Sequence, residues 1–430
     1  MVNWLSSKWG VLLKVTFIGI LYQTQHYGKL YLAFGYIASG SSMLEDTNIN
    51  NWEYSLLSGP AMLFISAISL LPSSRYSDYA TKPKFILIFS CICAAVFTGC
   101  NIFATSFLTL LWPRVLFSTL SSPIAPMNLR IMAEFFDMKK RGFASGAYFL
   151  SLYIGLALAS LCMLISVYVG WRFTYLFLGL VSLSGSFIFG ILLPTIKNTK
   201  EKKTLSQDLK SLYMNKTLIL CVIGLAFKYI SQFTRSSFES LYFARAFPDD
   251  VSTYSILNSI GLLVCPWSPL ILGKISDDLE CKYPNIKVYL CAITLALPIP
   301  FFIIMYLTTN FALAMVCLYI MSLFSEAYIS LSYTIMINVT LPHIKALQTA
   351  WMMAITMFSG GVIILIIGFT YNTIEDLRIS LIISNTFPLL ISSMLFFLIT
   401  KVYLKDLKTF EENKAGLVNE SFFNEVTTSH

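Results

Sequence analysis

The stretch Pro72-Ser73-Ser74-Arg75-Tyr76-Ser77-Asp78-Tyr79-Ala80-Thr81-Lys82-Pro83-Lys84 is a short polar interruption between two long apolar runs, residues 56–71 and 85–104. A second polar stretch, Gly273-Lys274-Ile275-Ser276-Asp277-Asp278, follows roughly two hundred residues later, again beside apolar runs. Recurrence of a feature at such a distance indicates a duplicated architecture. We therefore interpret both stretches as hinges and expect the chain to have two related halves.

The composition is that of a membrane protein. Of 430 residues, 56% are hydrophobic and 12% are charged, whereas a soluble domain has about 25% charged residues. About twelve apolar stretches, each of about 20 residues and so long enough to cross the hydrocarbon, recur along the chain. These features predict an all-α membrane protein with twelve transmembrane helices in two pseudo-symmetric halves of six helices.

The predicted domains follow from the spacing of these stretches. We expect a first half at residues 1–194, a basic cytosolic linker at 195–216, a second half at 217–404, and a cytosolic tail at 405–430. The linker is assigned because six lysines and few apolar side chains fall between Thr195 and Lys216.

The basic residues indicate how the chain lies in the membrane. The net charge of +8 comes from lysines and arginines clustered in short loops rather than on one basic face, so we expect no nucleic-acid partner. Most of these loops fall on one side, and the opposite loops hold little more than Arg172, Arg245 and Arg378. Both termini are predicted to be cytosolic, in either the plasma membrane or an internal membrane.

Several charged and polar residues lie inside the apolar stretches. Lys228, Gln232, Arg235 and Glu239 are separated by four, three and four positions, which places them on one helical face. In the first span, Gln25, His26 and Lys29 lie on a common face with Tyr22 in the same way. A charge at the centre of a membrane helix costs at least about 2.5 kcal/mol, so such residues usually face a cavity or a partner.

These motifs together resemble the major facilitator superfamily. Both hinges are similar to the family's signature loop: Asp78 with the basic residues Lys82 and Lys84 in the first, and Gly273 with Asp277 in the second. Arg114 followed by Ser118, Ser121 and Ser122 looks like the arginine motif of span four, and Gly170-Trp171-Arg172 is similar to the turn before span six. Pro123 to Pro126, the stretch Met132-Ala133-Glu134-Phe135-Phe136, and Arg141 are faintly similar to the spinster-like and organic-anion branches.

The resemblance implies a central cavity lined by spans one, four, seven and ten. The stripe on span seven would then meet His26, Lys29, Arg114 and Glu326. We predict that the cationic side chains bind an anionic group of a substrate by charge-assisted hydrogen bonds. The alternative is internal pairing of Arg235 with Glu239, with Lys29 reaching the headgroups. The predicted substrate-binding residues are Gln25, His26, Arg114, Lys228, Gln232 and Arg235.

Two further roles are assigned to charged residues. Glu239 and Glu326 are candidates for proton coupling, because burial can bring a carboxyl group into the neutral pH range, and His26 titrates there unperturbed. The resemblance implies that carboxylates in the two polar stretches hold the cytosolic side of the protein shut. We therefore expect Asp78, Lys82 and Asp277 to act in gating.

The predicted function is secondary active transport of a small organic anion by alternating access, with coupling to protons as an option. The alternatives are transport of a neutral or lysolipid-like solute, and a transporter-like receptor or structural subunit that does not transport. No GxxxxGK[ST] loop, HExxH motif or cysteine pair with metal-ligand spacing occurs, so we expect no enzyme activity, cofactor or metal. The expected partners are a small-molecule substrate, protons and the lipid bilayer, and the expected oligomeric state is a monomer.

Overall fold

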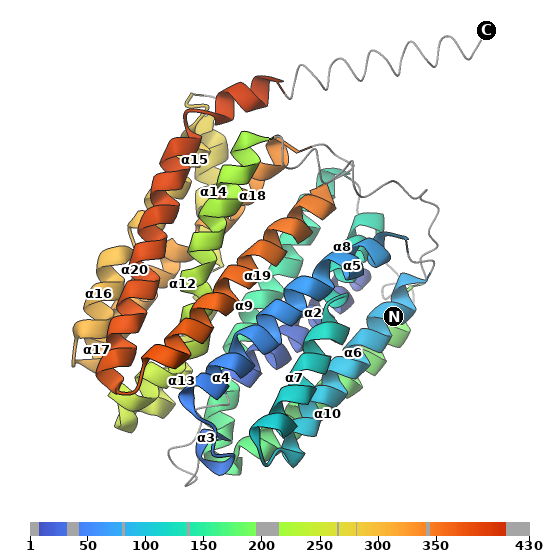
Figure 1. Ribbon diagram of the computed structural model, residues 1–430. Helices are drawn as coiled ribbons and strands as arrows, with labels where there is room; N and C mark the ends of the chain where they lie inside the picture. Colours follow the sequence, from blue (N-terminus) through green and yellow to red (C-terminus); the bar gives the residue numbers. More distant parts are fainter. Residues whose placement is uncertain are drawn as a thin grey trace.

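The computed structural model describes residues 8–31, 43–79, 82–135, 138–194, 215–264, 266–280, 282–340 and 345–409. Every regular element in these ranges is a helix, and the helices form one bundle (Figure 1). The prediction of an all-α protein is therefore confirmed. The predicted linker and the end of the predicted tail, residues 195–214 and 410–430, lie outside the described ranges.

The first half consists of the helices up to residue 192. They are α2 (Lys8–Tyr31), α3 (Met43–Asp46), α4 (Asn51–Ser58), a π-helical turn η1 (Pro60–Phe64), α5 (Ile65–Tyr79), α6 (Pro83–Gly99), η2 (Cys100–Phe103), α7 (Phe107–Ser121), α8 (Ile124–Phe135), α9 (Met138–Val169) and α10 (Trp171–Leu192).

The second half begins with α12. Its elements are α12 (Lys216–Ala246), η3 (Pro248–Asp250), α13 (Val251–Val264), α14 (Trp267–Glu280), α15 (Ile286–Ala296), α16 (Ile299–Leu307), α17 (Phe311–Glu326), α18 (Tyr328–Asn338), α19 (Lys345–Thr370) and α20 (Ile374–Ile399). In Figure 1 the helices coloured blue to green gather on one side of the bundle, and those coloured yellow to red gather on the other.

Each predicted span coincides with one helix or with consecutive helices. Nine segments of the described chain are long and apolar enough to cross a membrane. The places of the other three predicted spans are taken by α2, by α7 with α8, and by α9.

Prolines account for several of the breaks within spans. A proline removes a backbone donor and clashes with the preceding turn. Pro60 begins the π-helical turn that joins α4 to α5, Pro123 lies between α7 and α8, and Pro298 precedes α16. The sequence pattern showed these spans as continuous because hydropathy does not register a local change of helix geometry.

The two polar stretches interpreted as hinges are largely helical, which corrects that interpretation. Helix α5 continues to Tyr79, and α14 contains the whole of Gly273 to Asp278. Polar side chains at the end of a span can be solvated while the helical backbone keeps its own hydrogen bonds, so polarity alone did not locate the turn. The connections are the shorter segments 80–82 and 281–285, of which residues 80, 81 and 281 lie outside the described ranges.

The two halves meet at the end of the bundle where α4 and α13 begin and α19 ends, which we call the closed end. Here α9 packs against α13, and the end of α19 packs against α4, while earlier turns of α19 pack against α5 farther along the bundle. Ser160 and Ser255 each donate from the hydroxyl to the other's main-chain carbonyl, over 3.1 and 2.5 Å. The Tyr54 hydroxyl donates to the Ser237 carbonyl over 2.8 Å, and the Asn51 amide donates to the Tyr371 carbonyl over 3.1 Å. These contacts hold the halves together at this end.

Candidate functional site

The polar stripe of α12 lies in the interior of the bundle. Its members are Lys228, Gln232, Arg235 and Glu239, and their spacing along a 31-residue helix puts them on one face. The helix begins where the Asn215 side chain accepts a hydrogen bond from the Leu218 amide, a regular amino-terminal cap. The apolar residues of the same helix pack against α19 and α20, which fixes the direction in which the stripe points.

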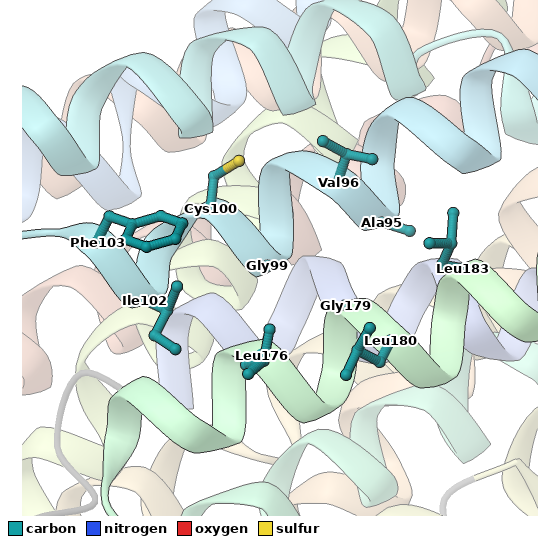
Figure 2. A pocket seen from close by; sticks show the side chains of 10 residues that line it. All are labelled: Ala95, Val96, Gly99, Cys100, Ile102, Phe103, Leu176, Gly179, Leu180 and Leu183. Carbon is teal, nitrogen blue, oxygen red and sulfur yellow. The ribbon is translucent and has the colours of Figure 1, made fainter.

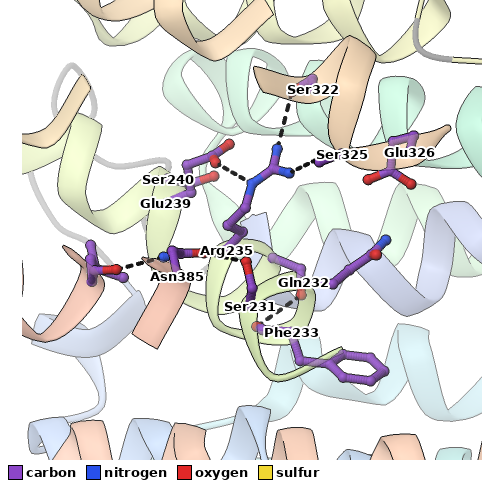
Figure 3. A network of polar contacts seen from close by, with 12 residues as sticks. Ser231, Gln232, Phe233, Arg235, Glu239, Ser240, Ser322, Ser325, Glu326 and Asn385 are labelled. Carbon is purple, nitrogen blue, oxygen red and sulfur yellow. Dashed lines mark hydrogen bonds and ion pairs between the residues drawn. The ribbon is translucent and has the colours of Figure 1, made fainter. Parts of the chain in front are cut away.

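Arg235 is held by an ion pair and two serines. Its Nε donates to Glu239 Oε2 over 3.0 Å, and its terminal nitrogens donate to Ser322 and Ser325 over 3.2 and 3.4 Å. Figure 3 shows the guanidinium between Glu239 and these serines of α17. The side chain of Arg235 is 13% exposed. The guanidinium thus has both a counter-ion and hydrogen-bond acceptors within the second half.

Lys228 belongs to a second pair within the stripe. Its Nζ lies 3.9 Å from Glu326 Oε1, donates to Gln232 Oε1, and sits 4.4 Å from the centre of the Tyr328 ring. The Tyr153 hydroxyl, which comes from α9 of the first half, donates to Glu326 Oε2 over 3.3 Å. Glu326 therefore joins the two halves in the middle of the bundle as well as balancing the charge of Lys228.

A separate group of cations lies in the first half. Arg114 on α7 donates from Nη2 to the Lys29 carbonyl over 3.1 Å, and the Tyr175 hydroxyl reaches the same oxygen over 3.3 Å. The Lys29 ammonium lies over the Phe117 ring, 2.7 Å from its centre. We call Lys29, Arg114 and Phe117 the cation cluster. All three side chains are fully buried.

Gln25 and His26 lie next to this cluster on α2. The Gln25 side chain accepts from the Thr98 hydroxyl over 3.0 Å and donates to the Leu21 carbonyl over 3.2 Å. The His26 ring lies edge-on to Tyr27 and is stacked near Phe117. Among the described residues, His26 Nδ1 has no hydrogen-bond partner.

The structure thus brings together part of the predicted site. Glu326 meets the stripe through Lys228, in line with what the family resemblance implied, whereas His26, Lys29 and Arg114 gather around Phe117. Sequence reasoning missed Tyr153 and the two serines on Arg235, because neutral hydroxyl residues inside a span carry no distinctive pattern. For the two serines, the one available signal is the spacing of Ser322 and Ser325, which places both on one face of span ten.

The predicted gating residues lie at the ends of the helices away from the closed end. Asp277 is 70% exposed and pairs with Lys287 over 2.9 Å, and Lys287 also binds Glu280. The pair joins α14 to α15 on the two sides of their connection. Lys82 is exposed near the Phe85 ring. Asp78 belongs to α5, but its side chain lies outside the described part of the chain.

An apolar pocket lies away from both polar groups, between α6 and α10. Its volume is about 290 Å³, and Figure 2 shows that Gly99 and Gly179 lie between larger apolar side chains. Phe103 and Leu180 in its wall are largely exposed on the outer face of the bundle. This position is that of a surface in contact with lipid tails.

Comparison with known proteins agrees with the fold. The family model of the Major Facilitator Superfamily matches residues 29–279. Because this match covers more than half of the chain, the protein belongs to the Major Facilitator Superfamily, a family of transporters. No curated protein sequence matches the chain.

Solved structures show the same architecture. A bacterial homologue of the human lysosomal transporter Spinster, in an inward-facing and unoccupied conformation, superimposes with a TM-score of 0.79 at 19% identity, covering 93% of this chain and 98% of that one. A peptide transporter POT in complex with sulfate gives 0.72 at 9% identity, with 91% and 94% covered. The nucleoside transporter NupG gives 0.64 at 12% identity, with 93% and 99% covered. At these identities the likeness establishes the fold alone.

Proposed function

We propose that the protein is a secondary active transporter of a small organic anion. The observation that carries this proposal is the balance of charge in the interior. Lys29, Arg114, Lys228 and Arg235 provide four cations, and Glu239 and Glu326 are the carboxylates that face them among the described side chains. Two of the four positive charges therefore have no carboxylate counter-ion among the described side chains. Charged residues inside a membrane span usually mark a binding site or a path for a solute or ion.

Alternating access is the proposed mechanism. The halves are joined through the closed end, and Tyr153 and Glu326 form a single hydrogen bond between them in the middle. A solute bound between the halves would replace contacts of this kind and shift the balance between the inward-facing and outward-facing states. Asp277, Lys82 and Asp78 are the proposed gating residues at the opposite end.

The predicted binding residues fall into two groups, those already paired with a carboxylate and those that are not. Arg235 is paired with Glu239 and Lys228 with Glu326, so an anion binds to either cation only by taking the place of its carboxylate. Gln25, His26 and Gln232 can contribute hydrogen bonds to a polar solute. Glu326 is the favoured proton-coupling residue because its protonation would release Lys228, and Glu239 could act on Arg235 in the same way.

Transport in reconstituted vesicles tests the proposal. We expect saturable uptake of at least one compound from a panel of organic anions. Neutral sugars, nucleosides and lysolipids are added in turn as competitors. Neutralising Arg114, or Lys228 and Arg235 together, should reduce this uptake by about tenfold or more, because each removes charge-assisted hydrogen bonds. Glu326→Gln should abolish the stimulation of uptake by a pH gradient.

The second candidate function is transport of a neutral or lysolipid-like solute. It is favoured by the internal pairing of Arg235 and Lys228, which leaves the stripe without net charge. Uptake of neutral solutes only, unchanged when the cations are neutralised in a correctly inserted protein, would replace the first proposal with this one.

A further inference from the structure

The cation cluster contains hydrogen-bond donors that have no acceptor. Among the described residues, Lys29 Nζ and Arg114 Nε and Nη1 make no hydrogen bond, although all three atoms are buried. Arg114 uses only Nη2, in its bond to the Lys29 carbonyl. Buried donors are normally satisfied, so a group of charged donors without acceptors at one place needs an explanation.

The described surroundings of the cluster supply no negative charge. Lys29 lies on the face of Phe117, which is stacked in turn with Tyr22. The Tyr175 hydroxyl already donates to the carbonyl that Arg114 uses. The His26 ring is stacked near Phe117 and adds a nitrogen, Nδ1, that has no hydrogen-bond partner in the part of the chain that the structure describes. The attraction of the Phe117 ring for an ammonium offsets only part of the cost of burying one.

The contrast with the second half is direct. There, Arg235 and Glu239 form one pair and Lys228 and Glu326 form another, so the stripe is neutral as a whole. The cation cluster has two cations and no described carboxylate. Lys29 and Arg114 are 0% exposed, whereas the Arg235 side chain is 13% exposed, so contact with water does not compensate the cations that lack a carboxylate.

We infer that Lys29 and Arg114 bind a compact group with two negative charges on the transported solute, a phosphate-type oxyanion or two neighbouring carboxylates. A single carboxylate would balance one cation and leave the other unpaired in the interior. A dianion balances both, and its several oxygens can accept from Arg114 Nε and Nη1 and from the Lys29 ammonium together. The stripe of α12 then contacts uncharged polar parts of the solute. This inference rests on the proposed function and specifies where its anionic group binds.

Thermal stabilisation of the purified full-length protein tests the inference. The probes are inorganic phosphate and succinate, both as dianions at pH 8, with acetate as the singly charged control at equal ionic strength. The variants are Lys29→Gln and Arg114→Gln, and Arg172→Gln is the matched control because it removes an arginine of the first half that lies outside the predicted site and has its own carboxylate, Asp46. A bound ligand raises the melting temperature in proportion to the logarithm of its concentration over Kd.

We expect phosphate or succinate, but not acetate, to stabilise the parent protein and the Arg172→Gln variant. The Kd of that dianion should rise about tenfold or more in Lys29→Gln and Arg114→Gln, through loss of charged hydrogen bonds. Without ligand, Lys29→Gln should melt at a higher temperature than the parent, because it removes an unpaired buried charge. That last result also shows that the variant is folded.

Three results would overturn the inference. These are stabilisation by acetate as strong as by the dianions, unchanged stabilisation by dianions in both cluster variants, or no stabilisation of the parent protein by any of the three anions. Anion uptake that requires Arg235 but neither Lys29 nor Arg114 would contradict it while the proposed function stands. Uptake of neutral solutes alone would contradict both.

Discussion

Arg235 and Glu239 lie one helical turn apart on α12, and each is the main partner of the other. The pair is buried, and Ser322 and Ser325 complete the surroundings of the guanidinium. Placing two charges in the interior has a large desolvation cost, and the mutual attraction repays it only when both partners remain. Loss of one partner alone should therefore destabilise the protein more than loss of both partners.

This reasoning predicts the outcome of a double-mutant cycle. Glu239→Gln should destabilise the protein by about 3 kcal/mol, because Arg235 loses its counter-ion. The double variant Arg235→Gln with Glu239→Gln should recover a large part of that loss. Ser322→Ala is the control, with an expected cost of about 1 kcal/mol for one neutral donor or acceptor. Denaturation in detergent measures these three variants and the single variant Arg235→Gln, and additive effects of the two single substitutions in the pair would show that Arg235 and Glu239 are not coupled.

At the scale of elements, α6 and α10 approach closely where two glycines meet. A Cβ on Gly179 would lie 2.8 Å from Gly99 Cα and 3.0 Å from the Ala95 carbonyl, which are backbone atoms that cannot rotate away. A Cβ on Gly99 would lie 3.9 Å from Gly179 Cα, an ordinary contact. Small residues at such crossings are the usual way in which membrane helices pack closely.

The two glycines should therefore respond differently to the same substitution. Gly179→Ala should destabilise the protein by about 1–3 kcal/mol, since the helices must separate to admit the methyl group. Gly99→Ala should be neutral or slightly stabilising, because alanine favours the helix by about 1 kcal/mol over glycine. Thermal unfolding of the two variants in one detergent makes the comparison. Equal effects would mean that the helices adjust freely at this crossing.

At the scale of the whole molecule, the closed end joins the halves, and the proposed alternating access requires the halves to separate there. Ser160 on α9 and Ser255 on α13 face each other there through reciprocal hydrogen bonds. Asn258 and Ser259 add donors to Ser160 and to the Ala157 carbonyl. Alternating access requires all these contacts to break in the opposite state.

A reversible cross-link at this position should stop transport. We expect Ser160→Cys with Ser255→Cys, in a background without the nine native cysteines, to form a disulfide under mild oxidation. Uptake should fall to the level of empty vesicles and return on reduction, whereas each single cysteine variant should stay active. Full uptake by the cross-linked protein would contradict separation of the halves at this end.

The fold was predictable from the sequence because length and hydropathy determine which segments cross a membrane. The spacing of Lys228, Gln232, Arg235 and Glu239 likewise showed that they share a face. The sequence did not show that Glu326 would balance Lys228, or that Lys29 and Arg114 would be left together, because partners between spans depend on helix rotation and tilt. The polar ends of α5 and α14 were interpreted as hinges, since composition does not distinguish a solvated helix end from a turn.

The contacts at the closed end have a consequence for how the sequence can change over evolutionary time. In several of them, a side-chain hydroxyl or amide from one half meets a main-chain carbonyl of the other, as at Ser237, Tyr371 and Ala157. A main-chain oxygen is present whatever residue occupies the position. Substitutions on the accepting side therefore preserve the bond, and only the donor must be kept. The accepting positions in both halves can consequently diverge among relatives while the two halves still recognise each other.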